Sequence, residues 1–367
     1  MNNKYLIVDT RDIDDYNKLS FSGYKKNDVL NVLLKSIETK KIENTCNWVT
    51  ECICSGYIEL CWEKMLLYAS DVISINNPSL PNYLYKKNIL FYNIYNNIDK
   101  KKEKNEIIEL RNNQIIRNLF FSISIILALS SKTKRYNKYP KIKLEDFNFN
   151  NISLRLSANV NLLPDNFIHF NEPEELKIII NEIYYHLKNK TGGYDKCIYW
   201  IIWILEWEKK IKKNKGPWNI DNRNIDVDEK YKADLIWIIW EVILLESKYR
   251  DDNIKKQVQS LFELYISNFK IGKKNKRLPY LFNSVVYLMN NYNLNIEMIP
   301  NRDIYIQCQI NNNKLFELKK IYEVKPIVKK QVKIKKKKIK KTDDIDDIDD
   351  IDDIYKNKLD LFNNLPF

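Results

Sequence analysis

Two short runs of basic residues carry the side chains best suited to chemistry with a polyanion. The first run is "KKIKKNK" (209–215), and the second lies within "KIGKKNKR" (270–277). Clustered ammonium and guanidinium groups neutralise phosphates and release counterions, so both runs are candidate nucleic-acid contacts. The alternative is a pair of solvated helix ends, where cations complement the helix dipole. The candidate contacts are Lys209, Lys210, Lys212, Lys213, Lys215, Lys273, Lys274, Lys276 and Arg277.

The whole chain carries an excess of positive charge. Its 367 residues include 61 Lys and Arg against 48 Asp and Glu, which gives a net charge of +13. Such a surplus attracts polyanions, nucleic acid first and an anionic membrane second. Charges of both signs are interspersed, however, and the abundant Lys, Asn, Ile and Tyr also fit an AT-rich genome. DNA is therefore an expected partner, and a generally Lys-rich surface is the alternative.

The residue patterns of familiar catalytic sites are missing from the sequence. A phosphate-binding loop needs clustered glycines before its Lys and Ser or Thr. The only Gly-Lys pair, Gly272-Lys273, lacks the earlier glycine and is followed by Lys274. The two histidines, His169 and His186, belong to no metal-ligand motif, and His186 is predicted to be a surface helix residue. We expect no catalytic residue, cofactor or metal ion; an enzyme with an unrecognised site is the alternative.

Four cysteines near the N-terminus are the strongest metal-site candidates. Cys46, Cys52, Cys54 and Cys61 are separated by five, one and six residues, whereas zinc sites commonly pair cysteines two to four residues apart. The surrounding pattern is helical, and residues 52 and 54 would point to different helix faces. Buried core thiols are the favoured interpretation, and a metal site is the alternative.

Tryptophans recur at helical spacing in the second half of the chain. Trp200, Trp203 and Trp207 are followed by Trp237 and Trp240. Such rings could stack on unpaired bases, but Ile and Leu surround each of them. A core between paired helices is therefore the favoured interpretation, and a base-stacking platform is the alternative.

The elements that must position these residues are predicted to be helices. Apolar residues recur every three or four positions from Asn27 onward and again after the polar segment 137–170. Only 6 glycines are present, too few for most nucleotide-binding α/β folds. We predict an all-α protein with two helical domains and a disordered, charged tail. The predicted divisions are an N-terminal segment (1–20), a first helical domain (21–136), a connector (137–170), a Trp-rich helical domain (171–300), a short extension (301–324) and the tail (325–367).

The tail differs sharply in composition from the rest of the chain. Ten lysines occur between Lys325 and Lys341, and "DDIDDIDDIDDI" follows. Such blocks cannot bury enough apolar surface to become ordered. The chain then ends on "KLDLF", which is similar to the Q-L-D-L-F peptides that dock into bacterial sliding clamps, with Lys358 in place of the glutamine. The candidate docking residues are Leu359, Leu361 and Phe362.

The stretch "WEKMLLYASDVISINNPSL" (62–80) reads as a helix that ends in a turn. Together with "KSI" (35–37), "NW" (47–48) and "LALSSKTKRY" (127–136), it resembles the helical C-terminal region of the RarA/MgsA family of AAA+ ATPases, which are related to clamp loaders. Lys132 stands at the position of the family's lysine in the last of these segments. The departures from the family pattern are Val72, Ser74, Asn77 and Ser131.

The resemblance covers residues 24–136 and implies a collar-like oligomerisation domain without its ATPase modules. It implies a homo-oligomer with a role in DNA transactions, and the second half of the chain resembles proteins of large nucleocytoplasmic DNA viruses. We therefore expect a non-enzymatic helical protein of viral DNA replication or repair that binds DNA or a replication partner. A structural or scaffold protein associated with the virion is the alternative.

The apolar runs are shorter than the roughly 20 residues that span a bilayer, and "MNNKYLIVDTRD" has no leader pattern. We accordingly expect a soluble intracellular protein without a membrane partner, located in the host cytoplasm, a viral factory or the nucleus.

Overall fold

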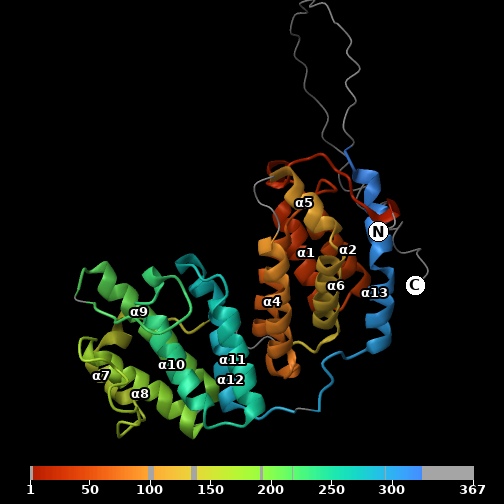
Figure 1. Ribbon diagram of the computed structural model, residues 1–367. Helices are drawn as coiled ribbons and strands as arrows, with labels where there is room; N and C mark the ends of the chain where they lie inside the picture. Colours follow the sequence, from red (N-terminus) through yellow and green to blue (C-terminus); the bar gives the residue numbers. More distant parts are fainter. Residues whose placement is uncertain are drawn as a thin grey trace, which may run out of the picture. The chain divides into compact units, whose positions relative to one another are not determined.

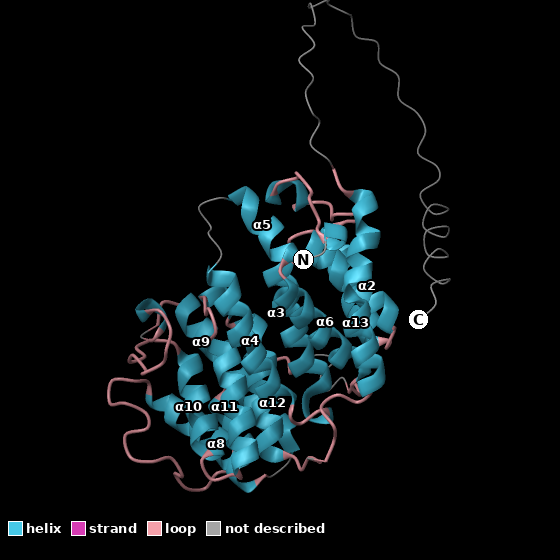
Figure 2. Cartoon of the chain, turned by 45° about the vertical axis from the view of Figure 1, so that its right-hand side comes forward, coloured by secondary structure: helices cyan, strands magenta, loops and turns pink. Residues whose placement is uncertain are grey.

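The computed structural model describes residues 3–97, 103–133, 139–190, 193–216, 218–293 and 295–324. Throughout these ranges the regular elements are helices, and the β pairing is limited to one isolated bridge between Leu19 and Lys25. Figure 2 accordingly shows helices joined by loops and no strand. The all-α prediction is confirmed. The predicted disordered tail, 325–367, lies outside the described residues.

The first half of the chain folds into six α-helices whose apolar faces meet. Gly56, with a φ of 71°, makes the turn that separates α2 from α3. Asn113 caps α6 by accepting the backbone N–H groups of Ile115 and Ile116. These helices are α1 (Lys26–Glu38), α2 (Ile42–Cys54), α3 (Ile58–Tyr68), α4 (Leu80–Asn97), α5 (Glu103–Asn112) and α6 (Gln114–Leu129).

The corner between α3 and α4 is a packing element. A π turn (Ala69–Ile73) and a 3-10 turn (Ser74–Asn76) reverse the chain there, and Ser74 takes a φ of 46°. The Ser74 hydroxyl donates a hydrogen bond to the side-chain oxygen of Asn283, far away in sequence. The Asn77 amide donates to Ser130 Oγ at 3.1 Å. This part of "WEKMLLYASDVISINNPSL" therefore joins distant helices.

The second half contributes five helices: α8 (Glu174–Asn189), α9 (Gly193–Lys213), α10 (Leu235–Ser247), α11 (Asp252–Ile266) and α12 (Leu278–Met289). Trp200 and Trp203 are buried on α9, and Trp237 and Trp240 are buried on α10. The core interpretation of these four tryptophans is confirmed. Trp207 is half-buried and stacks on Trp203 with 6.0 Å between ring centroids. The connector 137–170 holds a short helix, α7 (Phe149–Arg155).

The last described helix, α13 (Arg302–Lys319), returns to the first half of the chain. It packs on α6 and α2, and Figures 1 and 2 show it alongside both. Just beyond it, the Val324 backbone N–H donates to Asp9 Oδ2 at 2.8 Å, and Val324 O accepts the Thr10 hydroxyl at 3.0 Å. The N-terminal segment is thus held against the end of α13.

The helices of the two halves belong to one compact unit, Met1–Lys325. Within it, α4 packs on α11, and the corner after α3 packs on α12. The boundaries predicted at residues 136, 170 and 300 stay predictions.

Candidate nucleic-acid interface

The two basic runs, far apart in sequence, meet at one buried carboxylate. Glu208 lies on α9 and accepts Lys212 Nζ at 2.7 Å from its own helix. Its other oxygen accepts Lys274 Nζ at 2.8 Å, and Lys274 also pairs with Asp234 at 2.6 Å. Burial strengthens these charge interactions and makes the shared carboxylate a fixed junction. The end of α9 and the segment 270–277 are therefore neighbours.

The second run contributes mainly to internal packing. Lys274 is buried, and Lys273 Nζ lies 2.5 Å from Glu63 Oε1. Arg277 is also buried; its guanidinium donates to the carbonyl oxygens of Tyr265 and Ser267, both at 2.6 Å. These cations are committed to the fold, so they offer little free positive charge to a phosphate.

Part of the first run is likewise engaged by neighbours. Lys209 Nζ lies 2.6 Å from Glu206 Oε1 on the exposed helix surface. Lys210 Nζ lies 4.6 Å from the ring centroid of Phe147. An exposed ion pair of this kind is weak, about 0–1 kcal/mol, so Lys209 can exchange its partner for a phosphate more readily than a buried lysine can.

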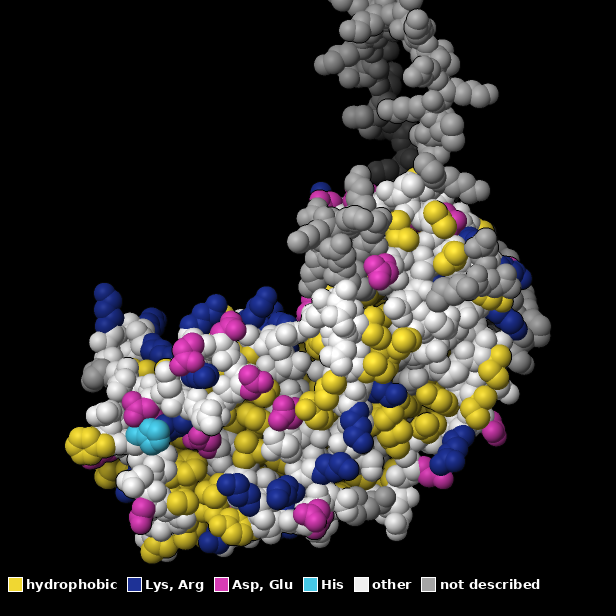
Figure 3. All heavy atoms as spheres, in the orientation of Figure 1, with side chains coloured by type: hydrophobic (Ala, Val, Ile, Leu, Met, Phe, Trp, Pro, Cys, Tyr) yellow, Lys and Arg dark blue, Asp and Glu magenta, His cyan; other side chains and the backbone are white. Residues whose placement is uncertain are grey.

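Within the two basic runs, the exposed cations that form no ion pair with a described residue are Lys213, Lys215, Lys270 and Lys276. Lys270 was not among the residues predicted as contacts, although it belongs to the second run. In Figure 3, Lys and Arg side chains gather along the edge of the molecule near α9 and α11, with Asp and Glu side chains among them. We refer to Lys213, Lys215 and Lys276 as the junction lysines.

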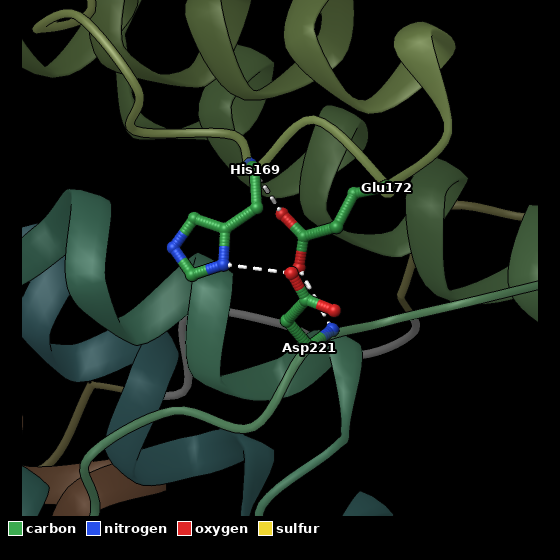
Figure 4. Close-up of side chains that lie close together, drawn as sticks. All are labelled: His169, Glu172 and Asp221. Carbon is green, nitrogen blue, oxygen red and sulfur yellow. Dashed lines mark hydrogen bonds and ion pairs between the residues drawn. The ribbon is translucent and has the colours of Figure 1, made fainter.

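A separate cluster joins His169, Glu172 and Asp221, and its ligand atoms lie within 4.8 Å of one another (Figure 4). His169 Nδ1 is 3.0 Å from Asp221 Oδ2. Glu172 is fully buried and accepts the backbone N–H groups of His169 at 2.9 Å and Asp221 at 3.1 Å. The cluster therefore joins the end of the connector to the segment after α9.

The same cluster already contains a cation, the buried guanidinium of Arg223. Arg223 Nη2 is 2.8 Å from Glu172 Oε2, and Nη1 is 2.8 Å from His169 Nδ1. Arg223 Nε is 2.9 Å from Glu241, whose pKa burial raises. A metal ion at His169 and Glu172 would have to displace this guanidinium, because two cations cannot share such a small space. The donor set therefore fits an ionic contact between loops better than a metal centre.

The prediction for His186 is wrong, because its side chain is fully buried. Nε2 lies 2.9 Å from Glu182 Oε1, one turn earlier on α8. Burial alone would raise the pKa of Glu182, but His186 and the backbone N–H groups of Ala158 and Ser157 lower it. The pair thus anchors the middle of the connector, at Ser157 and Ala158, to α8. The helical pattern of the sequence did not reveal this contact.

The cysteines at positions 46, 52, 54 and 61 are buried, which confirms the core interpretation. Burial raises the pKa of Cys54 to about 12. The thiol of Cys46 interacts with that of the half-buried Cys308 on α13, and this interaction lowers the pKa of Cys308 and raises that of Cys46. One thiol of the contact is therefore more acidic and more accessible than its partner.

In native protein, Cys308 is expected to react with a maleimide faster than any other cysteine. Its reaction rate should rise with a midpoint below the ordinary thiol pKa of about 8.5, because the thiolate is the nucleophile. Mass spectrometry of samples quenched over time from pH 6 to pH 9 measures this midpoint. The C46A variant should move it upward, since the interaction with the Cys46 thiol is lost. An unchanged midpoint, or faster labelling elsewhere, would contradict the assignment.

Other predicted site residues are placed as follows. Leu359, Leu361 and Phe362 lie outside the described residues. Lys132 donates a hydrogen bond to the carbonyl oxygen of Ala128 at the end of α6, and burial lowers its pKa to about 8.

Among the described helices, none combines the length and the apolar character needed to cross a membrane.

Comparison with known proteins adds no family to these observations. No protein-family model matches this sequence, and comparisons with curated proteins and with solved structures find no match. The resemblance to a RarA-type collar therefore stays an expectation from the residues quoted above.

Proposed function

We propose that this chain is a non-catalytic helical protein that binds nucleic acid where its two basic runs meet. The observation that carries the proposal is the junction at Glu208, which holds the end of α9 against the segment 270–277. The junction lysines, which belong to these two segments, are exposed and form no ion pair with a described residue. Phosphate contacts of this kind supply affinity with little sequence preference.

The finer role rests on the sequence resemblance. A collar-like first domain supports DNA as the nucleic acid and replication or repair as the setting, in a large DNA virus. It also supports a homo-oligomer, in which several copies of the junction would act on one strand. The terminal "KLDLF" supports docking to a replication partner such as a sliding clamp.

The K213Q/K215Q/K276Q variant is expected to bind DNA about tenfold more weakly than the wild type at 100 mM salt. Each lost phosphate contact should also reduce the slope of log affinity against log salt by about 0.7–0.9. Fluorescence anisotropy with labelled single-stranded, duplex and forked oligonucleotides measures both quantities. These three side chains take part in no described ion pair, so the thermal midpoint should stay close to that of the wild type.

A matched control removes the same charge from another part of the surface. Lys18, Lys25 and Lys41 are exposed and lie within the first 41 residues of the chain. K18Q/K25Q/K41Q also lowers the net charge from +13 to +10, and it should change affinity less than twofold. Equal losses in both variants would mean that only net charge matters and that the junction is not the interface.

A scaffold role is the second candidate, and exposed apolar side chains favour it. In and beside the connector, Leu144, Phe149, Leu154 and Phe170 each expose 80% or more of their surface. Exposed apolar groups that occur together mark protein contacts. Failure of the wild type to bind any of the three DNA forms at low salt would overturn the nucleic-acid proposal and favour a role in protein contacts.

A further inference from the structure

A groove of about 810 Å³ lies between α4 and the segment 263–273. Its walls come from α3, α4, the end of α11 and the loop 226–228. The volume falls within the range of roughly 300–1,000 Å³ that is typical of ligand sites. On the α4 wall, the Asn88 amide is already used, because it accepts Trp62 Nε1 and donates to Ser267 Oγ, both at 3.0 Å. The groove is thus built on a fixed wall.

The groove is acidic, in contrast to the chain as a whole. Four carboxylates line it, at Glu59, Asp226, Asp228 and Glu263, against two lysines. Lys273 is engaged by Glu63 at 2.5 Å, which leaves Lys270 as the unpaired cation of the lining. Of the four acids, Asp228 alone lies near a lysine in the described part of the chain, 3.7 Å from Lys230.

The other three acids keep their negative charge available to a ligand. Glu59 contacts the Tyr92 hydroxyl at 3.5 Å, and Glu263 accepts the Gln259 amide at 2.9 Å. Neither contact is ionic, and no ion pair to Glu59, Asp226 or Glu263 is found within the described ranges. Negative charge without a counterion disfavours phosphate in the groove and favours a cation.

The neutral lining fits a peptide chain that carries such cations. Tyr85 and Tyr92 of α4 line the groove, and aromatic rings attract ammonium and guanidinium groups. Asn93 and Asn96 are exposed on the same helix, where their amides can both donate to and accept from a peptide backbone. Tyr and Asn together give the adaptable polar contacts common in protein–peptide recognition.

We propose that this groove binds a basic, extended peptide segment of a partner protein, with Glu59, Asp226 and Glu263 receiving its Lys or Arg side chains. The groove adjoins the nucleic-acid junction, because Lys270 and Lys273 of the segment 270–277 line it, but its carboxylates make it opposite in charge. The overall positive field of the chain works against the approach of a cation, so binding must come from local carboxylates. Such binding weakens steeply with salt.

The test uses the full chain and acetylated, labelled octalysine in fluorescence anisotropy. The E59Q/D226N/E263Q variant should bind at least tenfold more weakly than the wild type at 50 mM salt. The D165N/E175Q/D303N variant removes three exposed carboxylates elsewhere, and its affinity should stay within twofold of the wild type. Equal losses in both variants, or no binding by the wild type, would overturn the proposal.

Two further experiments test whether the peptide binds in the groove rather than at other acidic segments, and whether the groove prefers a peptide to a small polyamine. Carbodiimide cross-linking joins a lysine amine of the peptide to a contacting carboxylate, and mass spectrometry should place the bonds at Glu59, Asp226 or Glu263. Cross-links confined to the Asp-rich segment 343–353 would contradict the proposal that the peptide binds in the groove. Spermine should compete at least tenfold more weakly than octalysine, and equal competition would show that the peptide backbone is not recognised.

Discussion

Replacing Lys319 by methionine is expected to lower the free energy of unfolding by about 3–5 kcal/mol. Lys319 Nζ lies 2.6 Å from Glu51 Oε2, and the Glu51 side chain has no exposed surface. The carboxylate otherwise accepts the neutral donors of Ser20 and Ser22. Without the ammonium group, a buried negative charge remains with no cation, which is the costly outcome.

The loss of unfolding free energy in K319M should be larger at pH 7 than at acidic pH. Burial would raise the pKa of Glu51, but Lys319 and the serine hydroxyls lower it in the native protein. The wild-type carboxylate therefore adds stability above the ordinary Glu pKa of about 4.3, and this stability is lost as the pH falls through the lowered native pKa. In K319M burial dominates and the pKa rises, so the native state takes up a proton early as the pH falls.

Urea denaturation at pH 7 and pH 4.5 measures this difference between K319M and the wild type. The deficit should be largest at pH 7 and smaller at pH 4.5. The E51Q/K319M double variant provides the control, because it leaves no charge in the site, and it should be more stable than K319M at pH 7. A deficit independent of pH, with no recovery in the double variant, would show that lost packing and not charge explains the effect.

Two buried arginines on neighbouring helices should respond oppositely to the same substitution. R117M is expected to cost about 3 kcal/mol or more, because it removes several hydrogen bonds at once. The Arg117 guanidinium stacks on Phe316 at 3.6 Å, and burial lowers its pKa to about 10. Its acceptors are Arg111 O at 2.7 Å, Asn112 Oδ1 at 2.9 Å, Tyr5 O at 3.1 Å and Asn313 Oδ1 at 3.2 Å.

Arg111 is equally buried, but none of its guanidinium nitrogens has a hydrogen-bond acceptor among the described residues. Its charge faces the rings of Tyr16 and Phe21, at 5.6 and 5.7 Å. Since burying an unpaired charge costs more than such ring contacts return, R111M is expected to be neutral or to stabilise by about 1–2 kcal/mol. Parallel urea titrations of R111M and R117M measure the change in the free energy of unfolding that each substitution causes. Equal destabilisation would mean that Arg111 has a polar partner in solution.

Local patterns in the sequence were enough to predict the helices. The apolar spacing in "KCIYWIIWILEWEKKIKK" and "DLIWIIWEVILLE" predicts two buried helices, and α9 and α10 occupy these segments. Gly56 marks the break between α2 and α3 because only a few residue types tolerate its positive φ. Such signals lie within a turn or two of the element they define, so a single sequence contains them.

The pairing of charges could not be predicted in the same way. Glu51 and Lys319 are 268 positions apart, and neither is marked by a local motif. Lys274 looked like a surface lysine within a basic run, but its partners Glu208 and Asp234 come from elsewhere in the chain. Whether a lysine is free or committed is thus decided by tertiary packing. The same reason explains why His186 was predicted at the surface.

The return of α13 to the first helices has a consequence during protein synthesis. Residues of α2 leave the ribosome long before Lys319, the counterion of Glu51, which lies 268 positions later in the chain. Domains ordinarily fold in order as they emerge. Here Glu51 of α2 stays without its counterion, and one face of α6 stays uncovered, until α13 has been translated. The first helices therefore complete their packing only after residue 319 has been made, and chains stalled before it should be preferred substrates for chaperones and proteases.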